Sequence, residues 1–151
     1  MKLHTASEVI SLARRLETES AALYVKLAEC GGEADLMRSL STENERSIVQ
    51  IERAYYGVIS DALESGFAFD VESDDFEMPA WTVSGATVSG TVYADMLKAA
   101  IDAEARMVRF YGAAAEQSRS LLADMPRVFA QIARKHSARP GKLQALLEGS
   151  R

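Results

Sequence analysis

An internal repeat of two helical segments is the feature that most narrows what this chain can fold into. Residues 17–29, ETESAALYVKLAE, align with residues 104–116, EARMVRFYGAAAE, at one constant offset of 87 residues. A glutamate, a tyrosine and an alanine–glutamate pair recur at matching places, and the apolar residues around them are spaced by three or four. That spacing is typical of an amphipathic helix. Two related helices predict a bundle with internal pseudo-symmetry.

The first glutamate of each copy lies on the apolar side of its helix. Glu17 and Glu104 are each in line with apolar residues one to three turns away. These residues are Ile10, Ala13, Ala21, Tyr24 and Ala28 for Glu17, and Met96, Ala100, Met107, Tyr111 and Ala115 for Glu104. A carboxylate that faces a protein core is costly unless a cation meets it. We therefore expect a buried positive charge, either a metal ion or a basic side chain.

The rest of the chain predicts an all-α fold of four helices. We expect helices over about residues 5–30, 35–63, 91–119 and 124–139, and a short segment at 142–148. Thr5 and Glu8 have the spacing of a capping box at the start of the first helix. Residues 64–90 have no helical period and contain three glycines and a proline, so we expect one long crossover. Two helical hairpins joined by a single crossover form an established four-helix bundle topology.

Length and composition limit the class of protein. A chain of 151 residues, 48% of them hydrophobic, is long enough for a single domain, residues 1–151, with a sizeable core. The net charge of −5 argues against nucleic acid as a partner, and no apolar run is long enough to span a membrane. Cys30 is the single cysteine, which excludes an intramolecular disulfide and a Cys-x-x-Cys site. These features predict a cytoplasmic protein.

The second and fourth helices add candidate residues to the same interior. In the second helix, the apolar row passes through Glu43, and Arg46 lies one turn further on the same side. In the fourth helix, His136 ends the inward row and Arg139 follows one turn later, next to a Pro-Gly pair that breaks or kinks the helix. The two rows consist of Leu36, Leu40, Glu43, Ser47 and Ile51, and of Phe129, Ile132, Ala133 and His136.

With these residues, the chain resembles the rubrerythrin branch of the ferritin-like diiron-carboxylate proteins over about residues 8–140. The resemblance rests on the repeated Glu-x6-Tyr segments, the long crossover and the size of the chain. It implies a ferritin-like four-helix bundle. In that family, single glutamates from the first and third helices join a Glu-x-x-His motif from each of the other two helices to hold two metal ions. Glu17 and Glu104 match the single glutamates, and Glu43 matches the glutamate of the second helix.

The metal-ligand set departs from the family pattern in the second and fourth helices. The second helix has Arg46 where the family has histidine, and the fourth helix has no Glu-x-x-His motif. His136 takes either the histidine place, which makes Ala133 the lost glutamate, or the glutamate place, which puts Arg139 at the histidine. Both registers stay open from the sequence. The chain also lacks the cysteine-rich rubredoxin module of full rubrerythrins.

Two functions follow, and they differ in the cation that meets the glutamates. In the first, the cation is an iron, manganese or zinc ion, and the candidate ligands are Glu17, Glu43, Glu104 and His136. By the resemblance, an iron site would handle iron or oxidants, as a ferroxidase- or peroxidase-type oxidoreductase acting with oxygen or peroxide. Tyr24 and Tyr111 would then lie beside the metal ligands.

In the second function, the cation is arginine. Arg46, together with Arg139, pairs with the interior carboxylates, because the planar guanidinium bonds carboxylates in pairs. The bundle then binds no cofactor and serves as a non-enzymatic interaction or assembly subunit. With either cation, the resemblance implies a homodimer, formed through a helix face with exposed apolar residues such as Val49, Tyr55 or Tyr56. The sequence names neither an electron donor nor a protein partner.

Overall fold

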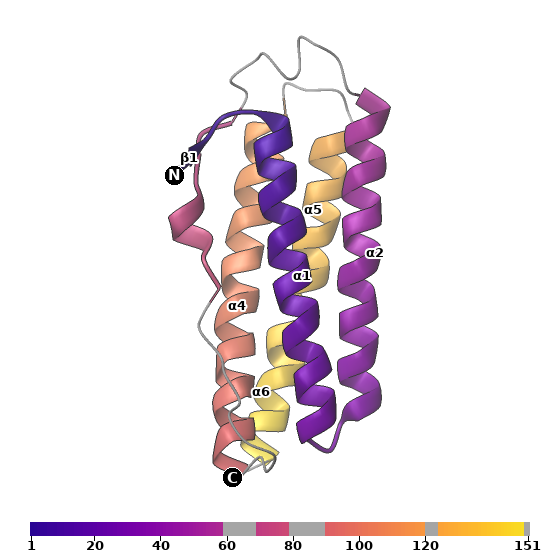
Figure 1. Cartoon of the computed structure of the whole chain (residues 1–151), viewed down its shortest axis with the longest axis vertical. Coiled ribbons are helices and arrows are strands. Elements are labelled where there is room, and N and C mark those ends of the chain that lie inside the picture. The colour runs from indigo at the N-terminus through magenta and orange to yellow at the C-terminus, as the bar shows by residue number, and fades with distance from the viewer. Residues whose placement is uncertain (59–68, 79–89, 120–123, 150–151) are drawn as a thin grey trace.

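The computed structural model describes residues 1–58, 69–78, 90–119 and 124–149 (Figure 1). Its helices are α1 (Ala6–Cys30), α2 (Ala34–Val58), α4 (Gly90–Gln117), α5 (Asp124–Ser137) and α6 (Arg139–Gly149). The all-α class is therefore confirmed, and the helix bounds agree with the predicted ones to within a few residues. Residues 59–63 of the predicted second helix lie outside the described residues.

The helices form a bundle in which they run side by side along the long axis of the molecule (Figure 1). α1 packs against α2 and α4, α5 packs against the same two helices, and α6 packs against α4. α6 follows α5 along one side of the bundle after an interruption at Ala138. The sequence predicts the break at Pro140 and Gly141, but both residues lie in the first turn of α6, and the break comes two residues earlier, at Ala138. Proline is tolerated there because a backbone N–H in the first turn of a helix has no partner within the helix.

The two ends of α1 are fixed by the local sequence. The Glu8 backbone N–H donates to Thr5 Oγ1 at 3.2 Å, and Glu8 Oε1 accepts from the Thr5 backbone N–H at 3.1 Å, which confirms the predicted capping box. At the other end, the N–H of Gly31 donates to the carbonyl of Leu27 at 3.1 Å. A Cβ atom at Gly31 would lie 2.1 Å from the Tyr93 ring. A larger residue at this position would therefore force the Tyr93 side chain of α4 to move.

A pair of short strands ties the N-terminus to the crossover. β1 (Lys2–Leu3) pairs antiparallel with β2 (Val71–Glu72), and the 3₁₀ helix η1 (Ser73–Phe76) packs against α4. The sequence does not predict these strands, because two residues are too few to show an alternating pattern. The other residues of the predicted crossover, 64–68 and 79–89, lie outside the described residues.

A layer of buried polar side chains divides the apolar core into two clusters. One cluster contains the N-terminal part of α1 together with most of the apolar residues of α5, and the other contains the C-terminal part of α1 together with α6. We call the residues between the clusters the polar layer: Glu17, Ser20, Ser41, Asn44, Ser47, Glu104, His136 and Arg139. All of them are at most 6% exposed, so the layer is enclosed by the bundle.

Candidate functional site

His136 lies at the centre of the polar layer and bridges the two repeated helices. Its Nε2 atom is 2.7 Å from Glu17 Oε1, and its Nδ1 atom is 2.5 Å from Glu104 Oε2. Ionised carboxylate oxygens only accept hydrogen bonds, so two ionised glutamates can both be bonded only by an imidazole that is protonated on both ring nitrogens. In that form, His136 is a buried cation shared by both glutamates.

Arg139 supplies a second buried positive charge. Its Nη1 atom donates to Glu104 Oε1 at 3.1 Å and to Asn44 Oδ1 at 2.6 Å. Its Nη2 atom donates to Glu43 Oε1 at 2.8 Å and to the carbonyl of Leu40 at 3.3 Å. The Arg139 side chain is 1% exposed, whereas that of Glu43 is 38% exposed. The guanidinium thus connects the interior Glu104 with a carboxylate at the edge of the layer.

Two tyrosines bond the repeated helices reciprocally. Tyr24 of α1 donates to Glu104 of α4 at 2.5 Å, and Tyr111 of α4 donates to Glu17 of α1 at 2.7 Å. Each tyrosine therefore serves the glutamate of the other repeat. The pseudo-symmetry expected from the offset in the sequence is present in these hydrogen bonds.

The tyrosine rings also contact the two cations. The ring of Tyr111 stacks on His136, with the centroids 5.6 Å apart and the planes 6° from parallel. The Arg139 guanidinium lies over the ring of Tyr24, 5.3 Å from its centroid. The face of an aromatic ring attracts a cation, most strongly where water is excluded. Each tyrosine therefore stabilises a glutamate through its hydroxyl and a cation through its ring.

The environment of the layer shifts the protonation equilibria toward this charged arrangement. Burial lowers the pKa of His136, but hydrogen bonds to the two glutamates outweigh burial and raise the pKa to about 9. Burial raises the pKa of Glu104, but His136 and Arg139 outweigh it and hold the pKa below its usual value. Burial, reinforced by a neighbouring glutamate, raises the pKa of Tyr24 and of Tyr111 well above 10. At neutral pH, imidazolium, ionised Glu104 and neutral tyrosines are favoured together.

Two buried polar atoms of the network, Glu17 Oε2 and Arg139 Nε, have no hydrogen-bond partner among the described residues. Glu17 is thus bonded through one oxygen only, whereas Glu104 accepts hydrogen bonds at both oxygens. Leaving a buried charged group partly unsatisfied is costly. Glu17 therefore depends more strongly on His136 and Tyr111 than Glu104 depends on any one of its donors.

The sequence identifies much of this network. Glu17, Glu104 and His136 meet in the interior as expected, and Tyr24 and Tyr111 lie beside them. For the fourth helix, the sequence leaves two registers open. The structure buries His136 and Arg139 together and leaves Ala133 only partly buried, so the inward pair is His136 with Arg139.

The inward row predicted for α2 is confirmed at Leu40, Ser47 and Ile51, which are buried, and is wrong at the two charged residues. Arg46 is solvent-exposed and does not reach into the bundle, and Glu43 is only partly buried. Asn44 is buried in their place, where its side-chain amide donates to Ser20 Oγ at 2.9 Å and its carbonyl accepts from Arg139. The sequence does not reveal Asn44, because a polar residue between two glutamates resembles the solvated face of a helix.

The interior donors do not fit the two-metal centre that the family resemblance implies. That centre uses four glutamates and two histidines, whereas the layer offers Glu17, Glu104 and one imidazole whose nitrogens both bond carboxylates. Arg139 adds a fixed positive charge beside Glu104, which opposes a further cation. Within the described ranges, no group of three or more His, Cys, Asp or Glu side chains is arranged to hold a metal ion.

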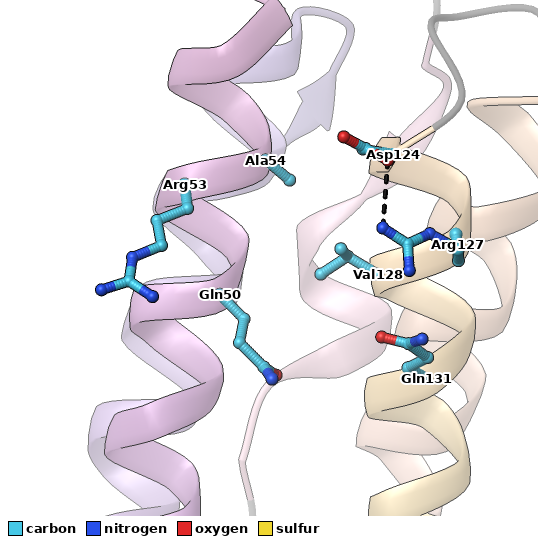
Figure 2. Close-up of a pocket in the computed structure, with 7 residues that line it drawn as sticks. All are labelled: Gln50, Arg53, Ala54, Asp124, Arg127, Val128 and Gln131. Atoms are coloured by element: carbon cyan, nitrogen blue, oxygen red, sulfur yellow. Dashed lines mark hydrogen bonds and ion pairs between the residues drawn. The ribbon is translucent and has the colours of Figure 1, made fainter.

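A groove lies between α2 and α5, outside the polar layer (Figure 2). Its volume is about 330 Å³, and its lining residues are Gln50, Arg53, Ala54, Asp124, Arg127, Val128 and Gln131. Arg127 is paired with Asp124 at 3.0 Å, and Gln50 accepts a hydrogen bond from Lys135 at 3.1 Å. Several polar groups of the groove are thus already bonded within the chain.

Comparisons of the chain with known protein families, with curated protein sequences and with solved structures find no match. None of the helices in the described ranges is both long enough and apolar enough to cross a membrane. The chemistry of the polar layer and of the helix surfaces is therefore the basis for assigning a function.

Proposed function

We propose that the chain is a ferritin-like four-helix bundle of the rubrerythrin type in which protein cations replace the metal centre, and that it acts as a non-enzymatic interaction or assembly subunit. α5 and α6 together form the fourth helix in this proposal. One observation carries it: both interior glutamates already have a buried cationic side chain within hydrogen-bond distance. The opposite charge that a carboxylate in a core requires is thus part of the chain.

Charge balance supports this proposal. Glu17 and Glu104 bring two negative charges into the polar layer, and His136 and Arg139 bring two positive charges. A divalent ion added to this set would leave excess positive charge in an interior that is shielded from water, which is unfavourable. To bind a metal, the layer would first have to lose the His136 proton or expel the Arg139 side chain.

The spacing of the two cations fits a site that once followed the family motif. His136 and Arg139 are three residues apart across the Ala138 interruption, as glutamate and histidine are in Glu-x-x-His. Each cation reaches a glutamate on a different helix from its own. The network therefore joins α1, α4 and the α5–α6 segment, which is a structural role that needs no metal.

If the polar layer only holds the helices together, the residues that carry the function of the bundle lie on its surface. α2 exposes Val49 and Tyr56, which are 45% and 64% exposed. Tyr55, which the sequence also suggested for this face, is 8% exposed and belongs to the core. Large apolar side chains that share one exposed helix face mark the part of the surface best suited to bind a protein.

A second candidate function is favoured by Glu17 Oε2, the buried oxygen without a partner among the described residues. A single iron, manganese or zinc ion bound at Glu17, with His136 deprotonated, would preserve the iron- or oxidant-handling role expected from the resemblance. Because the pKa of His136 is raised to about 9, such binding would strengthen as the pH rises above neutral.

Metal analysis separates the two candidates. The purified chain is examined by elemental analysis and then titrated with Fe(II) under anaerobic conditions at pH 7 and pH 9. The proposal predicts no metal above background and no saturable binding at either pH. One or two metal ions per chain, lost in Glu17→Ala and Glu104→Ala but retained in Glu45→Ala, would contradict it. Glu45 is the matched control because it is an exposed glutamate on α2.

A further inference from the structure

The outer side of α2 carries a symmetric arrangement of apolar and charged residues centred on Val49. Residues three, four and seven positions away from Val49 in both directions share one side of the helix. We call this surface the α2 face, and its residues are Thr42, Glu45, Arg46, Val49, Glu52, Arg53 and Tyr56. All of them are exposed except Glu52, which is half-buried.

The charges of the α2 face are separated by sign. At 3.6 residues per turn, three sets run along the helix: a central line, an acidic side and a basic side. Their members are Thr42, Val49 and Tyr56 in the central line, Glu45 and Glu52 in the acidic side, and Arg46 and Arg53 in the basic side. Glu52 pairs with Arg14 of α1 at 2.8 Å, so the acidic side adjoins α1. Arg53 lines the groove toward α5, so the basic side adjoins α5.

Most of these charges are available to a partner. In the part of the chain that the structure describes, Glu45, Arg46 and Arg53 have no hydrogen-bond or ion-pair partner. Although Arg53 lines the groove, its guanidinium extends away from α5, whereas the side chain of Gln50 points toward α5 (Figure 2). The α2 face therefore presents unpaired charges of both signs around an exposed apolar line.

We propose that a second copy of this chain binds the α2 face through its own α2 face, with the two helices parallel and related by a two-fold axis along them. The central lines then meet, so that Val49 faces its counterpart in the second copy. The acidic side of each copy meets the basic side of the other. Glu45 lies opposite Arg46 of the second copy, Glu52 lies opposite Arg53, and each pair occurs twice. The proposed function is that of an assembly subunit, and this contact identifies a second copy of the chain as its partner. The inference therefore rests on the proposed function.

The separation of the charges selects the parallel orientation. A two-fold axis perpendicular to the helices would bring the two basic sides together and the two acidic sides together, with Arg46 next to Arg53 of the second copy. Like charges in contact disfavour such a pairing, which is how proteins exclude wrong arrangements. Because the face complements itself in one orientation only, a second copy fits it better than a protein without the same pattern.

Sedimentation and disulfide cross-linking of the full chain test the contact. The chain is expected to sediment as a dimer, with twice the 16.5 kDa mass of one copy. In a Cys30→Ser background, Thr42→Cys alone and Tyr56→Cys alone should each form a disulfide-linked dimer, because each position faces itself. A monomer at every concentration would overturn the proposal. So would a disulfide that forms only when the two cysteine variants are mixed, which is the antiparallel result.

Charge reversal tests the pairing without cysteine. Glu45→Arg places like charges together at two symmetric positions, so it should weaken the dimer about tenfold, as for two exposed ion pairs. Val25→Glu on α1 is the control, because Val25 is as exposed as Val49 but lies outside the α2 face. Stronger association in Glu45→Arg, or equal weakening in Val25→Glu, would overturn the pairing. The dimer measurement and the metal measurement are independent, so each proposal can fail alone.

Discussion

The two repeated helices, α1 and α4, share the internal symmetry of the sequence, whereas the other helices that contribute to the polar layer, α2, α5 and α6, do not. α1 and α4 each contribute one glutamate and one tyrosine, and their hydrogen bonds are reciprocal. α2 contributes the neutral side chains of Ser41, Asn44 and Ser47, whereas the α5–α6 segment contributes both buried cations. The anions are thus symmetric and the cations are not.

This difference concentrates the stability of the network in one short segment. Both glutamates depend on residues 136–139, whichever half of the bundle they belong to. The two glutamates also accept different numbers of hydrogen bonds: Glu104 accepts from three donors and Glu17 from two. Substitution of a buried cation should therefore cost more stability than substitution of an exposed one. Loss of a donor to Glu17 should cost more than loss of a donor to Glu104.

Removal of the shared cation should have the largest effect. His136→Leu leaves both buried glutamates without the imidazolium, and breaking a buried ion pair from one side costs about 3–5 kcal/mol. Urea unfolding at pH 7, followed by circular dichroism, measures the loss. Arg134→Leu, an exposed cation on the same helix, is the control and should change stability by less than about 0.5 kcal/mol. Equal losses in the two variants would show that His136 does not bridge the glutamates.

The second largest difference in stability is expected between substitutions of Arg139 and of Arg46, the two arginines that the sequence places near the interior glutamates. Arg139→Met removes the guanidinium that bonds Glu104, Asn44 and Glu43, at a cost of about 3 kcal/mol. Arg46→Met changes an exposed side chain and should cost less than about 0.5 kcal/mol. The same unfolding measurement compares them. A larger loss in Arg46→Met would restore the register predicted from the sequence.

Alkaline pH should weaken the network gradually. The pKa of His136 is raised from 6.5 in the unfolded chain to about 9 in the folded chain. Its contribution to stability is therefore complete below pH 6.5 and is lost as the pH rises through about 9. The stability difference between the wild-type chain and His136→Leu should shrink between pH 7 and pH 9.5. A difference that stays constant over this range would contradict a cationic His136.

The smallest expected effects compare the two tyrosines. Tyr111→Phe removes one of two donors to Glu17, and Tyr24→Phe removes one of three donors to Glu104. We expect losses of about 2.5 kcal/mol and about 1.5 kcal/mol, within the range for hydrogen bonds to charged groups. Urea unfolding of both variants at pH 7 measures the order. The reverse order would mean that Glu17 has a donor outside the described residues.

The sequence predicts the symmetric half of the network better than the asymmetric half. Glu17 and Glu104 stand out because a charge interrupts a row of large apolar residues, and the repeat shows the interruption twice. Asn44 is not predicted because it lies among charged residues, and the row through Leu40 and Ser47 passes equally well through Glu43. The place of Arg139 depends on how the chain turns at Ala138, which local spacing does not determine.

The central claim is that the interior glutamates are neutralised by side chains and not by metal. Nitrogen NMR of the His136 ring tests this claim most directly. Substitution of His4 distinguishes its signals from those of His136. Our account predicts that both His136 nitrogens carry protons at pH 7, that the ring titrates with a pKa of about 9, and that added Zn(II) leaves its signals unchanged. A neutral ring at pH 7, or a nitrogen that shifts on binding Zn(II) and returns with chelator, would contradict it.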